Sequence, residues 1–226
     1  MNVLYEDNHL IIVNKSSGET VQADPSGDVP LEQTMKDYLK RKYGKPGAVF
    51  LGIVHRLDRP VSGVVVFART TKAQLRLNRM FREKLIQKTY WAVVKDLPPD
   101  EAGTLTHYIV RNTKTNRSHA YLKECRDSKK AVLHYRHIAS SDRYHLLEID
   151  LETGRHHQIR CQLAAVGCPI RGDLKYGYPR SNPNGGISLH ARRIRFKHPV
   201  KDGDIDLAAP LPDDPLWKVF EDSAKG

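Results

Sequence analysis

The sequence lacks any long apolar stretch. No purely apolar run is longer than the one from Val64 to Ala68, whereas a membrane-spanning helix needs about 20 such residues. The N-terminal segment MNVLYEDNHL also lacks the basic stretch followed by an apolar stretch that marks a signal peptide. We therefore expect a cytoplasmic protein that has no membrane partner.

Cysteine is scarce as well. Only three cysteines occur in the 226 residues, and they form neither a Cys-x-x-Cys pair nor a Cys/His zinc spacing. An odd number of scattered cysteines argues against a disulfide framework and against a structural zinc site. We expect Cys125, Cys161 and Cys168 to be free thiols in a reducing compartment.

Acidic residues are in the minority. The chain has 26 Asp and Glu against 37 Lys and Arg, which gives a formal net charge of +11. A surface of this sign attracts polyanions, so RNA or DNA is the first partner to consider. Charge alone leaves open the alternative of a merely basic soluble protein.

Apolar periodicity predicts more strands than helices. Strands are expected at residues 3–5, 10–13, 64–67, 88–95 and 144–151, with short hairpin strands between 96 and 142. Helices are expected at 31–43, from Thr70 or Thr71 to about Leu85, around 159–166, and at the tail near 216–220. Strands that follow one another without a crossover helix favour an α+β fold on a mixed, mostly antiparallel sheet. Since no linker, repeat or low-complexity tract interrupts the chain, we expect residues 1–226 to form a single domain.

The segment His55 to Gly63, HRLDRPVSG, places an acid between two arginines just ahead of a buried strand. Pro60 and Gly63 predict a tight loop. A carboxylate between cations stays ionised at neutral pH, as a nucleophile must, and the same cations can hold phosphate. Taken alone, the segment fits equally a structural loop in which Asp58 pairs with arginine.

A second polar segment, Glu152 to Arg160, leads into the helix predicted around 159–166. The start of a helix offers free backbone N–H groups and positive potential, which suits a phosphate. Arg160 follows the apolar Ile159 and can reach inward as a fixed cationic partner for an acid.

Three blocks of the chain resemble the RluA family of RNA pseudouridine synthases. HRLDRPVSGVVVFA is similar to that family's HRLDxxTSGxxxxA, and TGRHHQIRCQLAAVGCPIRGDLKYG to its TGRxHQIRxHLxxxGxPIxGDxxYG. A third block, Leu189-His190-Ala191 with Phe196, His198 and Pro199, is similar to its LHAxxLxFxHP. The blocks occur in the family's order from about Leu10 to Pro212, so the resemblance covers the whole chain and implies the pseudouridine synthase catalytic fold.

The resemblance implies an isomerase that converts uridine in RNA to pseudouridine without a cofactor or a metal ion. Asp58 matches the essential aspartate, which begins the reaction by nucleophilic attack or by proton abstraction from the ribose. Tyr90 matches a tyrosine that stacks on the base and assists proton removal at C5. Arg160 matches the basic residue that pairs with the aspartate.

The target uridine of such an enzyme lies in folded RNA and must be flipped out of its stack. Our candidates for holding the flipped nucleotide and its phosphates are Arg56, Arg59, Arg155, His157 and Gln158. A tRNA and the large-subunit rRNA are both compatible with the sequence, and we expect a monomer.

The chain departs from the family pattern at a few positions. Val61 stands where Thr is usual, and Cys161-Gln162 stands where Val-His is common. Neither change replaces a reacting group, so we expect effects on loop packing or substrate choice rather than on activity. The chain also begins directly with catalytic-domain sequence, so we expect a short form without the family's separate N-terminal RNA-binding domain.

Two other functions compete with this interpretation. The first is a noncatalytic RNA-binding or assembly protein of the same fold, which would have no use for the combination of Asp58, Tyr90 and Arg160. The second is a metal-dependent nuclease built on Asp58, Asp173 and the histidines. The histidines lack a known metal-ligand spacing, which disfavours the nuclease.

Overall fold

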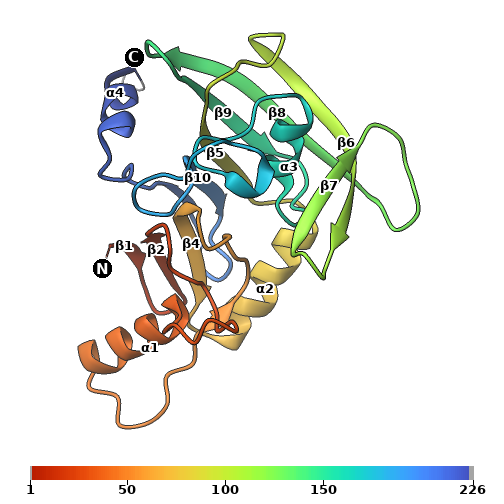
Figure 1. Ribbon diagram of the computed structural model, residues 1–226. Coiled ribbons are helices and arrows are strands. Elements are labelled where there is room, and N and C mark those ends of the chain that lie inside the picture. Colours follow the sequence, from red (N-terminus) through yellow and green to blue (C-terminus); the bar gives the residue numbers. More distant parts are fainter. Residues whose placement is uncertain (1, 224–226) are drawn as a thin grey trace. The chain divides into compact units, whose positions relative to one another are not determined.

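The computed structural model describes residues 2–223 (Figure 1). The chain divides into two compact units. Unit 1 comprises the chain up to Gln87 together with Ala191–Pro210, and unit 2 comprises Lys88–His190 together with the chain from Leu211 onward. The single domain expected over residues 1–226 stays a prediction.

Unit 1 contains a sheet in which strands β1, β2, β4 and β10 lie side by side, with β3 pairing β4 and β11 pairing β10. The strands are β1 Val3–Glu6, β2 Leu10–Lys15, β3 Gly52–Ile53, β4 Ser62–Ala68, β10 Leu189–Lys197 and β11 Asp204–Ala208. All seven residues of β4 are buried, as the unbroken apolar sequence predicts. The two strands predicted at 3–5 and 10–13 are confirmed as β1 and β2, which pair antiparallel.

Asp7 forms the turn between β1 and β2. Its Oδ1 accepts hydrogen bonds from the backbone N–H groups of His9, at 2.7 Å, and Leu10, at 2.8 Å. Its Oδ2 lies 2.7 Å from Nζ of Lys201 and 3.1 Å from Nε2 of His198. These contacts hold the pKa of the Asp7 carboxyl far below its usual range, although partial burial acts in the opposite direction. One carboxylate therefore joins the first hairpin to the segment that follows β10.

Two helices pack on the unit 1 sheet, α1 Leu31–Lys42 and α2 Thr71–Arg82. Both confirm the predicted helices, and the Thr70 hydroxyl caps α2 by accepting from the N–H of Ala73 at 3.2 Å. The predicted end near Leu85 is wrong. The helix stops at Arg82 because Lys84 adopts a left-handed backbone conformation with φ of 58°, and Leu85 is left 57% exposed.

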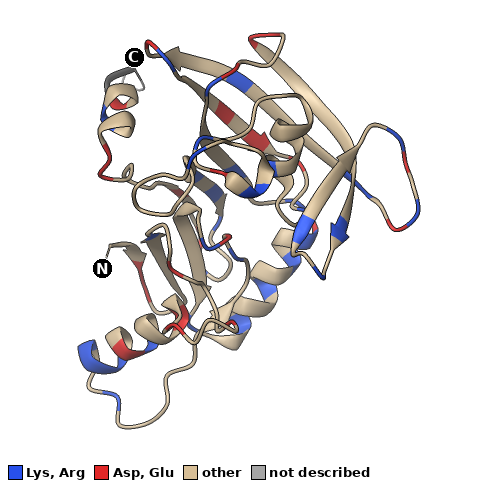
Figure 2. Ribbon diagram, viewed as in Figure 1, with Lys and Arg blue, Asp and Glu red and all other residues tan. Residues whose placement is uncertain are grey.

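Unit 2 is built on an antiparallel sheet with strand order β5-β9-β8-β6-β7. The strands are β5 Gln87–Val94, β6 Ala102–Asn112, β7 Arg117–Tyr121, β8 Lys129–Ser140 and β9 His145–Leu151. The helical elements are α3 Gln158–Ala165, the short 3-10 helix η1 Leu174–Tyr176, and α4 Pro215–Ser223. The loop that joins β7 to β8 carries both basic and acidic residues (Figure 2).

The region between 96 and 142 differs from the prediction in the length of its strands. We expected short hairpin strands, whereas β6 has 11 residues and β8 has 12. In β6 more exposed and less exposed residues alternate over the first nine positions, and in β8 buried and exposed residues alternate from Leu133 to Arg136. Polar side chains on one face of each strand therefore interrupt the apolar pattern that would reveal it. The expectation that this region forms antiparallel hairpins rather than a linker is confirmed.

The C-terminal helix α4 closes one core of unit 2. Its range confirms the helix predicted near 216–220, and Trp217 and Phe220 are buried against Trp91, Val93 and Leu146. The elements together give the α+β class that the sequence predicts. Within residues 2–223 no helix is both long enough and apolar enough to span a membrane, and all three cysteines are free thiols.

Candidate functional site

The HRLD segment of unit 1 runs between β3 and β4. Leu57 and Val61 are buried, and the N–H of Val61 donates to the carbonyl oxygen of Asp58 at 3.0 Å, which closes a tight turn. The Asp58 side chain is half-buried, whereas Arg56 and Arg59 on either side are exposed. The two apolar neighbours therefore anchor a turn that carries the carboxylate between two outward-facing cations.

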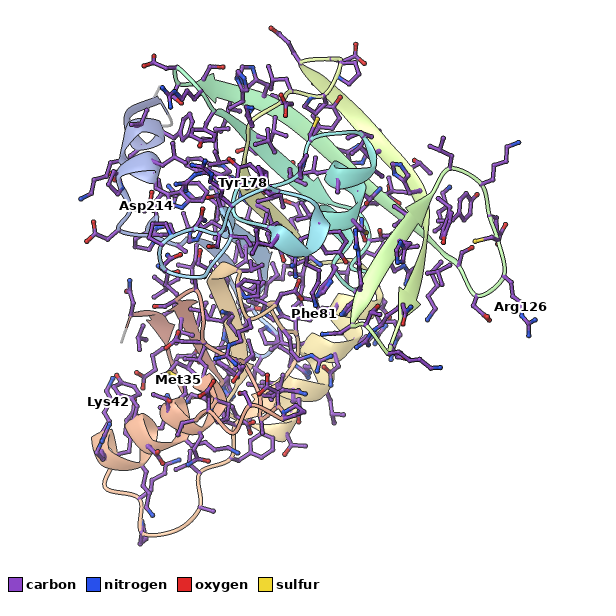
Figure 3. The ribbon with its side chains drawn as sticks, in the orientation of Figure 1. Met35, Lys42, Phe81, Arg126, Tyr178 and Asp214 are labelled. Carbon is purple, nitrogen blue, oxygen red and sulfur yellow. The ribbon has the colours of Figure 1, made fainter. Side chains whose placement is uncertain are left out.

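His55 fixes the start of this segment. Its Nε2 accepts a hydrogen bond from the backbone N–H of Val66 at 2.9 Å, and its ring packs on Phe81 of α2, with ring centroids 4.9 Å apart; Phe81 is labelled in Figure 3. Because a backbone N–H can only donate, Nε2 must carry no proton. His55 is thus a framework residue that ties the segment to β4 and α2.

Gly63 fixes the end of the segment, as the predicted tight loop requires. Its φ of 115° lies in the left-handed region, and a Cβ at this position would lie 2.3 Å from the carbonyl oxygen of Ala191. Only glycine combines this conformation with such a close approach of two backbones. The entry into β4 therefore admits no other residue without a shift of β10.

Lys15 is hydrogen-bonded to the backbone of the same segment, a role that was not predicted from the sequence. The side chain is only 1% exposed, and its Nζ donates to the carbonyl oxygens of Ser16 at 2.9 Å, Glu19 at 2.8 Å and Arg59 at 3.1 Å. Burial lowers the pKa of Lys15 to about 8, while the charges of Glu19 and Asp58 oppose that shift. The available signal in the sequence was a lysine at the end of the apolar strand LIIVNK. A lysine is rarely buried unless its charged group is paired with other polar groups.

Two further hydrogen bonds join the same two segments. The N–H of Gly18 donates to the carbonyl oxygen of Arg59 at 2.8 Å, and the Ser17 hydroxyl donates to that of Pro60 at 2.7 Å. With Lys15, they bind residues 16–19 to residues 59–60. The backbone that follows Asp58 is consequently held in place before any substrate arrives.

The exposed arginines differ in their surroundings. Arg59 lies 2.5 Å from an exposed carboxylate oxygen of Asp28, a solvent-facing pair that contributes little to stability. Arg56 makes no ion pair with any residue from 2 to 223. Both guanidinium groups face solvent, where they are accessible to a polyanion.

The second predicted segment belongs to unit 2, where α3 begins at Gln158. The Gln158 side chain is 3% exposed, and its Oε1 accepts from the Thr153 hydroxyl at 2.8 Å and from the N–H of Arg155 at 2.9 Å. Its Nε2 donates to the carbonyl oxygen of Val132 at 3.1 Å. The amide therefore organises the turn before α3 from inside the protein, while Arg155 is exposed and donates from Nε to the carbonyl oxygen of Lys130 at 3.0 Å.

His157 does not supply the positive charge that the sequence analysis expected of this segment. It is 8% exposed, adopts a left-handed backbone with φ of 53°, and its Nδ1 lies 2.8 Å from the Tyr176 hydroxyl. Burial, aided by the nearby charge of Arg160, lowers the pKa of His157 to about 2. The imidazole is therefore neutral at pH 7, and the cation of the predicted set that faces solvent here is Arg155.

The neutral state of His157 predicts a loss of stability in mild acid. The unfolded chain binds a proton below its ordinary pKa of 6.5 while the folded chain does not, so stability falls as the pH drops from about 6.5 towards 2. Between pH 7 and 5 this one site costs about 2 kcal/mol. Urea unfolding of wild-type protein and of His157→Asn at both pH values measures it: the wild type should lose about 2 kcal/mol more than the variant. Equal losses in the two proteins would contradict the assignment.

Arg160 makes a buried bidentate ion pair with Asp173. Its Nε lies 2.7 Å and its Nη2 2.9 Å from the two carboxylate oxygens, and the side chains are 6% and 1% exposed. The guanidinium also lies 5.0 Å from the centre of the Tyr176 ring. Arg160 is thus the fixed inward cation that the sequence predicts, with Asp173 as an acidic partner that the sequence did not identify. Its pairing with Asp58, a residue of unit 1, stays a prediction.

Tyr90 lies on β5 of unit 2, opposite Ile149 of β9. It is 9% exposed, and Trp91 and Ala92, the residues that follow it, are buried as well. The structure therefore places Tyr90 in the same unit as Arg160 and Asp173, and Asp58 with Arg56 and Arg59 in the other unit. Among residues 2–223 no cluster of three or more His, Cys, Asp or Glu side chains is arranged to hold a metal ion.

Comparison with known proteins leads to the same family as the three sequence blocks. Residues 9–165 match the RNA pseudouridylate synthase family. The chain is 33% identical to the uncharacterized RNA pseudouridine synthase YlyB of Bacillus subtilis (strain 168), over 95% of this chain and 70% of that protein. It is also 33% identical to the ribosomal large subunit pseudouridine synthase D of Xylella fastidiosa (strain Temecula1), over 99% of this chain and 71% of that protein.

Solved structures of two human proteins have the same fold as this chain. Human RNA pseudouridylate synthase domain containing 4 superimposes with a TM-score of 0.78 at 25% identity, covering 94% of this chain and 89% of that one. Human RNA pseudouridylate synthase domain containing 1 shows the same fold with a TM-score of 0.74, over 95% and 85% of the two chains. Together with the sequence matches, they confirm the predicted fold, and the chain belongs to the RluA-type family of RNA pseudouridine synthases.

Proposed function

We propose that Asp58 starts the conversion of uridine to pseudouridine in this enzyme and that Tyr90 and Arg160 act with it. The observation that carries the proposal is the turn that holds Asp58. A half-buried carboxylate sits on a backbone fixed by Lys15 on one side and by the close approach of Gly63 to Ala191 on the other. Such pre-organisation suits a group that must attack, or take a proton, in one defined geometry.

The reaction is an isomerisation that needs only a carboxylate and proton transfers. The bond between N1 of uracil and C1′ of ribose breaks, the base rotates, and a bond forms between C5 and C1′. A proton leaves C5 and N1 gains one, so no electron acceptor is required. We propose that Asp58 begins the sequence by nucleophilic attack or by proton abstraction from the ribose, and that the Tyr90 hydroxyl assists the late proton removal at C5.

Arg160 is proposed to hold a negative charge near the reacting groups. Its buried pair with Asp173 fixes the guanidinium, and two of the nitrogens, Nε and Nη2, bond that carboxylate. An arginine offers five N–H donors, so the same side chain can serve a second acid. We propose Asp58 as this second acid.

The RNA contacts are proposed for the exposed cations. Arg56 and Arg59 flank Asp58, and Arg155 precedes α3, all with their side chains exposed. For His157 and Gln158 we propose a supporting task instead, since both are buried and bonded inside unit 2. Their substitution should disturb the position of Arg155 rather than remove an RNA contact.

The names of two relatives support a proposal for the class of RNA. A synthase D of Xylella fastidiosa and a synthase C of Rickettsia prowazekii are both named for the ribosomal large subunit. We propose large-subunit rRNA as the substrate of this enzyme and tRNA as the alternative. We also propose that one monomer suffices and that residues 1–226 work as a single domain.

Release of tritium from RNA labelled at C5 of uridine tests the activity. Wild-type protein should release tritium from one of the two RNA classes, keep the RNA chain length unchanged and be insensitive to excess EDTA. A metal-dependent nuclease would shorten the RNA and lose activity with EDTA, and a noncatalytic binder would release no tritium from either class. Carbodiimide-induced reverse-transcription stops, compared with and without the protein, then map the modified uridine.

A further inference from the structure

We propose that the outer face of α2 binds the sugar-phosphate backbone of the substrate RNA. That face carries a stripe of four basic residues, called the basic stripe below, which are Lys72, Arg76, Arg79 and Arg82. The proposal deepens the proposed function, because it assumes that RNA is the substrate and adds a surface outside the Asp58 segment.

The stripe arises from the spacing of α2. Its residues follow one another at intervals of three or four, which places them on one side of a helix, and all four are exposed. Ala73 and Leu77 occupy the opposite side and are fully buried against the sheet of unit 1. In Figure 2 the basic residues recur along the length of α2. From Lys72 to Arg82 the helix rises about 15 Å, enough to follow several consecutive phosphates.

The charge on this face is largely uncompensated. The twelve residues of α2 include these four cations and no acid. Arg79 pairs with Glu83 just beyond the helix, an exposed contact of 2.7 Å, and Arg76 donates to the carbonyl oxygen of Pro199 at 2.7 Å. Lys72 and Arg82 form no ion pair with another residue of the described range 2–223.

Folding alone does not favour such a stripe. Like charges three or four residues apart repel each other on a helix, and Lys72 lies in the first turn, where the helix dipole disfavours a cation. A polyanion laid along the helix removes both penalties. RNA is the polyanion that an RNA pseudouridine synthase must bind, and phosphate contacts of this kind carry affinity without reading sequence.

Helix α1 of the same unit provides an internal comparison. It also has twelve residues and four cations, but it contains two acids, Glu32 and Asp37. Lys36 is paired with Glu32 at 2.6 Å, and Lys42 with Glu6 at 2.8 Å. The two helices thus carry equal positive charge, and only α2 presents it without acids of its own.

The salt dependence of RNA binding tests the stripe. The variant Lys72→Gln/Arg79→Gln/Arg82→Gln should bind the RNA identified by tritium release at least about tenfold more weakly at 0.1 M salt. The slope of log K against log salt should shrink by about 2 to 3, because each lost phosphate contact removes about one counterion. Turnover at saturating RNA should equal that of the wild type, since none of the three residues belongs to the proposed catalytic set.

The matched control is Lys40→Gln/Arg41→Gln/Lys45→Gln, which removes the same charge from exposed positions at the end of α1 and just beyond it. Its slope should stay close to that of the wild type. The proposal is overturned if the α2 variant keeps the wild-type slope, or if its slope changes no more than that of the α1 control. Circular dichroism confirms that both variants fold. A wild-type protein that releases no tritium would refute the proposed function instead, and the slopes with total RNA would still decide the role of α2.

Discussion

Replacing Asp58 with Ala is expected to abolish tritium release from C5-labelled RNA, with a loss in turnover on the order of 10⁴-fold or more, as for other enzymes that lose the group that attacks the substrate. RNA affinity should stay within about twofold of the wild type, because Arg56, Arg59 and the α2 stripe are unchanged. The side chain is half-buried on a turn fixed by backbone hydrogen bonds, so its removal leaves the fold in place. Single-turnover assays with saturating enzyme separate this loss from any effect on binding.

Two variants make the Asp58 experiment decisive. Asp58→Asn keeps the shape of the side chain and removes its charge, and it should be as inactive as Asp58→Ala. Asp28→Asn removes a nearby exposed carboxylate that pairs with Arg59, and it should retain activity. If Asp58→Asn turned over RNA at a tenth of the wild-type rate or better, neither nucleophilic attack nor proton abstraction by this residue would be tenable.

Replacing Asp173 with Ala is expected to destabilise the protein by about 3–5 kcal/mol, because it leaves the guanidinium of Arg160 buried without its carboxylate. Both side chains are almost inaccessible, at 6% and 1% exposure, so solvent cannot replace the lost partner. The midpoint of thermal unfolding should fall by on the order of 10 °C for a chain of this size. Urea unfolding followed by circular dichroism measures the free energy directly.

A double variant separates the ion pair from simple loss of packing. Arg160→Met combined with Asp173→Leu replaces both charges with apolar side chains, and buried pairs replaced in this way often lose little stability. The double variant should therefore be more stable than Asp173→Ala while lacking activity, because Arg160 is absent. If Asp173→Ala unfolded at the wild-type urea concentration, the pair would not have the structural importance that its geometry indicates.

Local patterns in the sequence predicted the elements that carry the candidate residues. The unbroken apolar run of β4 placed Asp58 just before a buried strand, and the spacing of Ile159 and Leu163 with the glycine at 167 predicted α3 and its end. Both inferences need only the periodicity of a strand or a helix and the turn preferences of glycine.

The surroundings of the same residues were harder to predict, because they depend on contacts between distant segments. Asp173, thirteen residues from Arg160, was considered only as a metal ligand. The neutral state of His157 depends on its burial beside Tyr176, and burial of a single histidine leaves no mark in a sequence. Lys15 escaped attention because the carbonyl oxygens that it binds belong to the backbone, which every residue has.

The tie between residues 16–19 and residues 59–60 has a consequence for how the chain can vary in length. Surface loops normally accept insertions and deletions, because little depends on their path. Here one loop reaches the other through Lys15, which bonds the carbonyl oxygen of Arg59 although the two residues are 44 positions apart. An added or deleted residue between Ser16 and Glu19 would shift the backbone that carries Asp58. We therefore expect natural variants and engineered grafts to tolerate insertions in the loop between β7 and β8 far better than in this inconspicuous turn near the N-terminus.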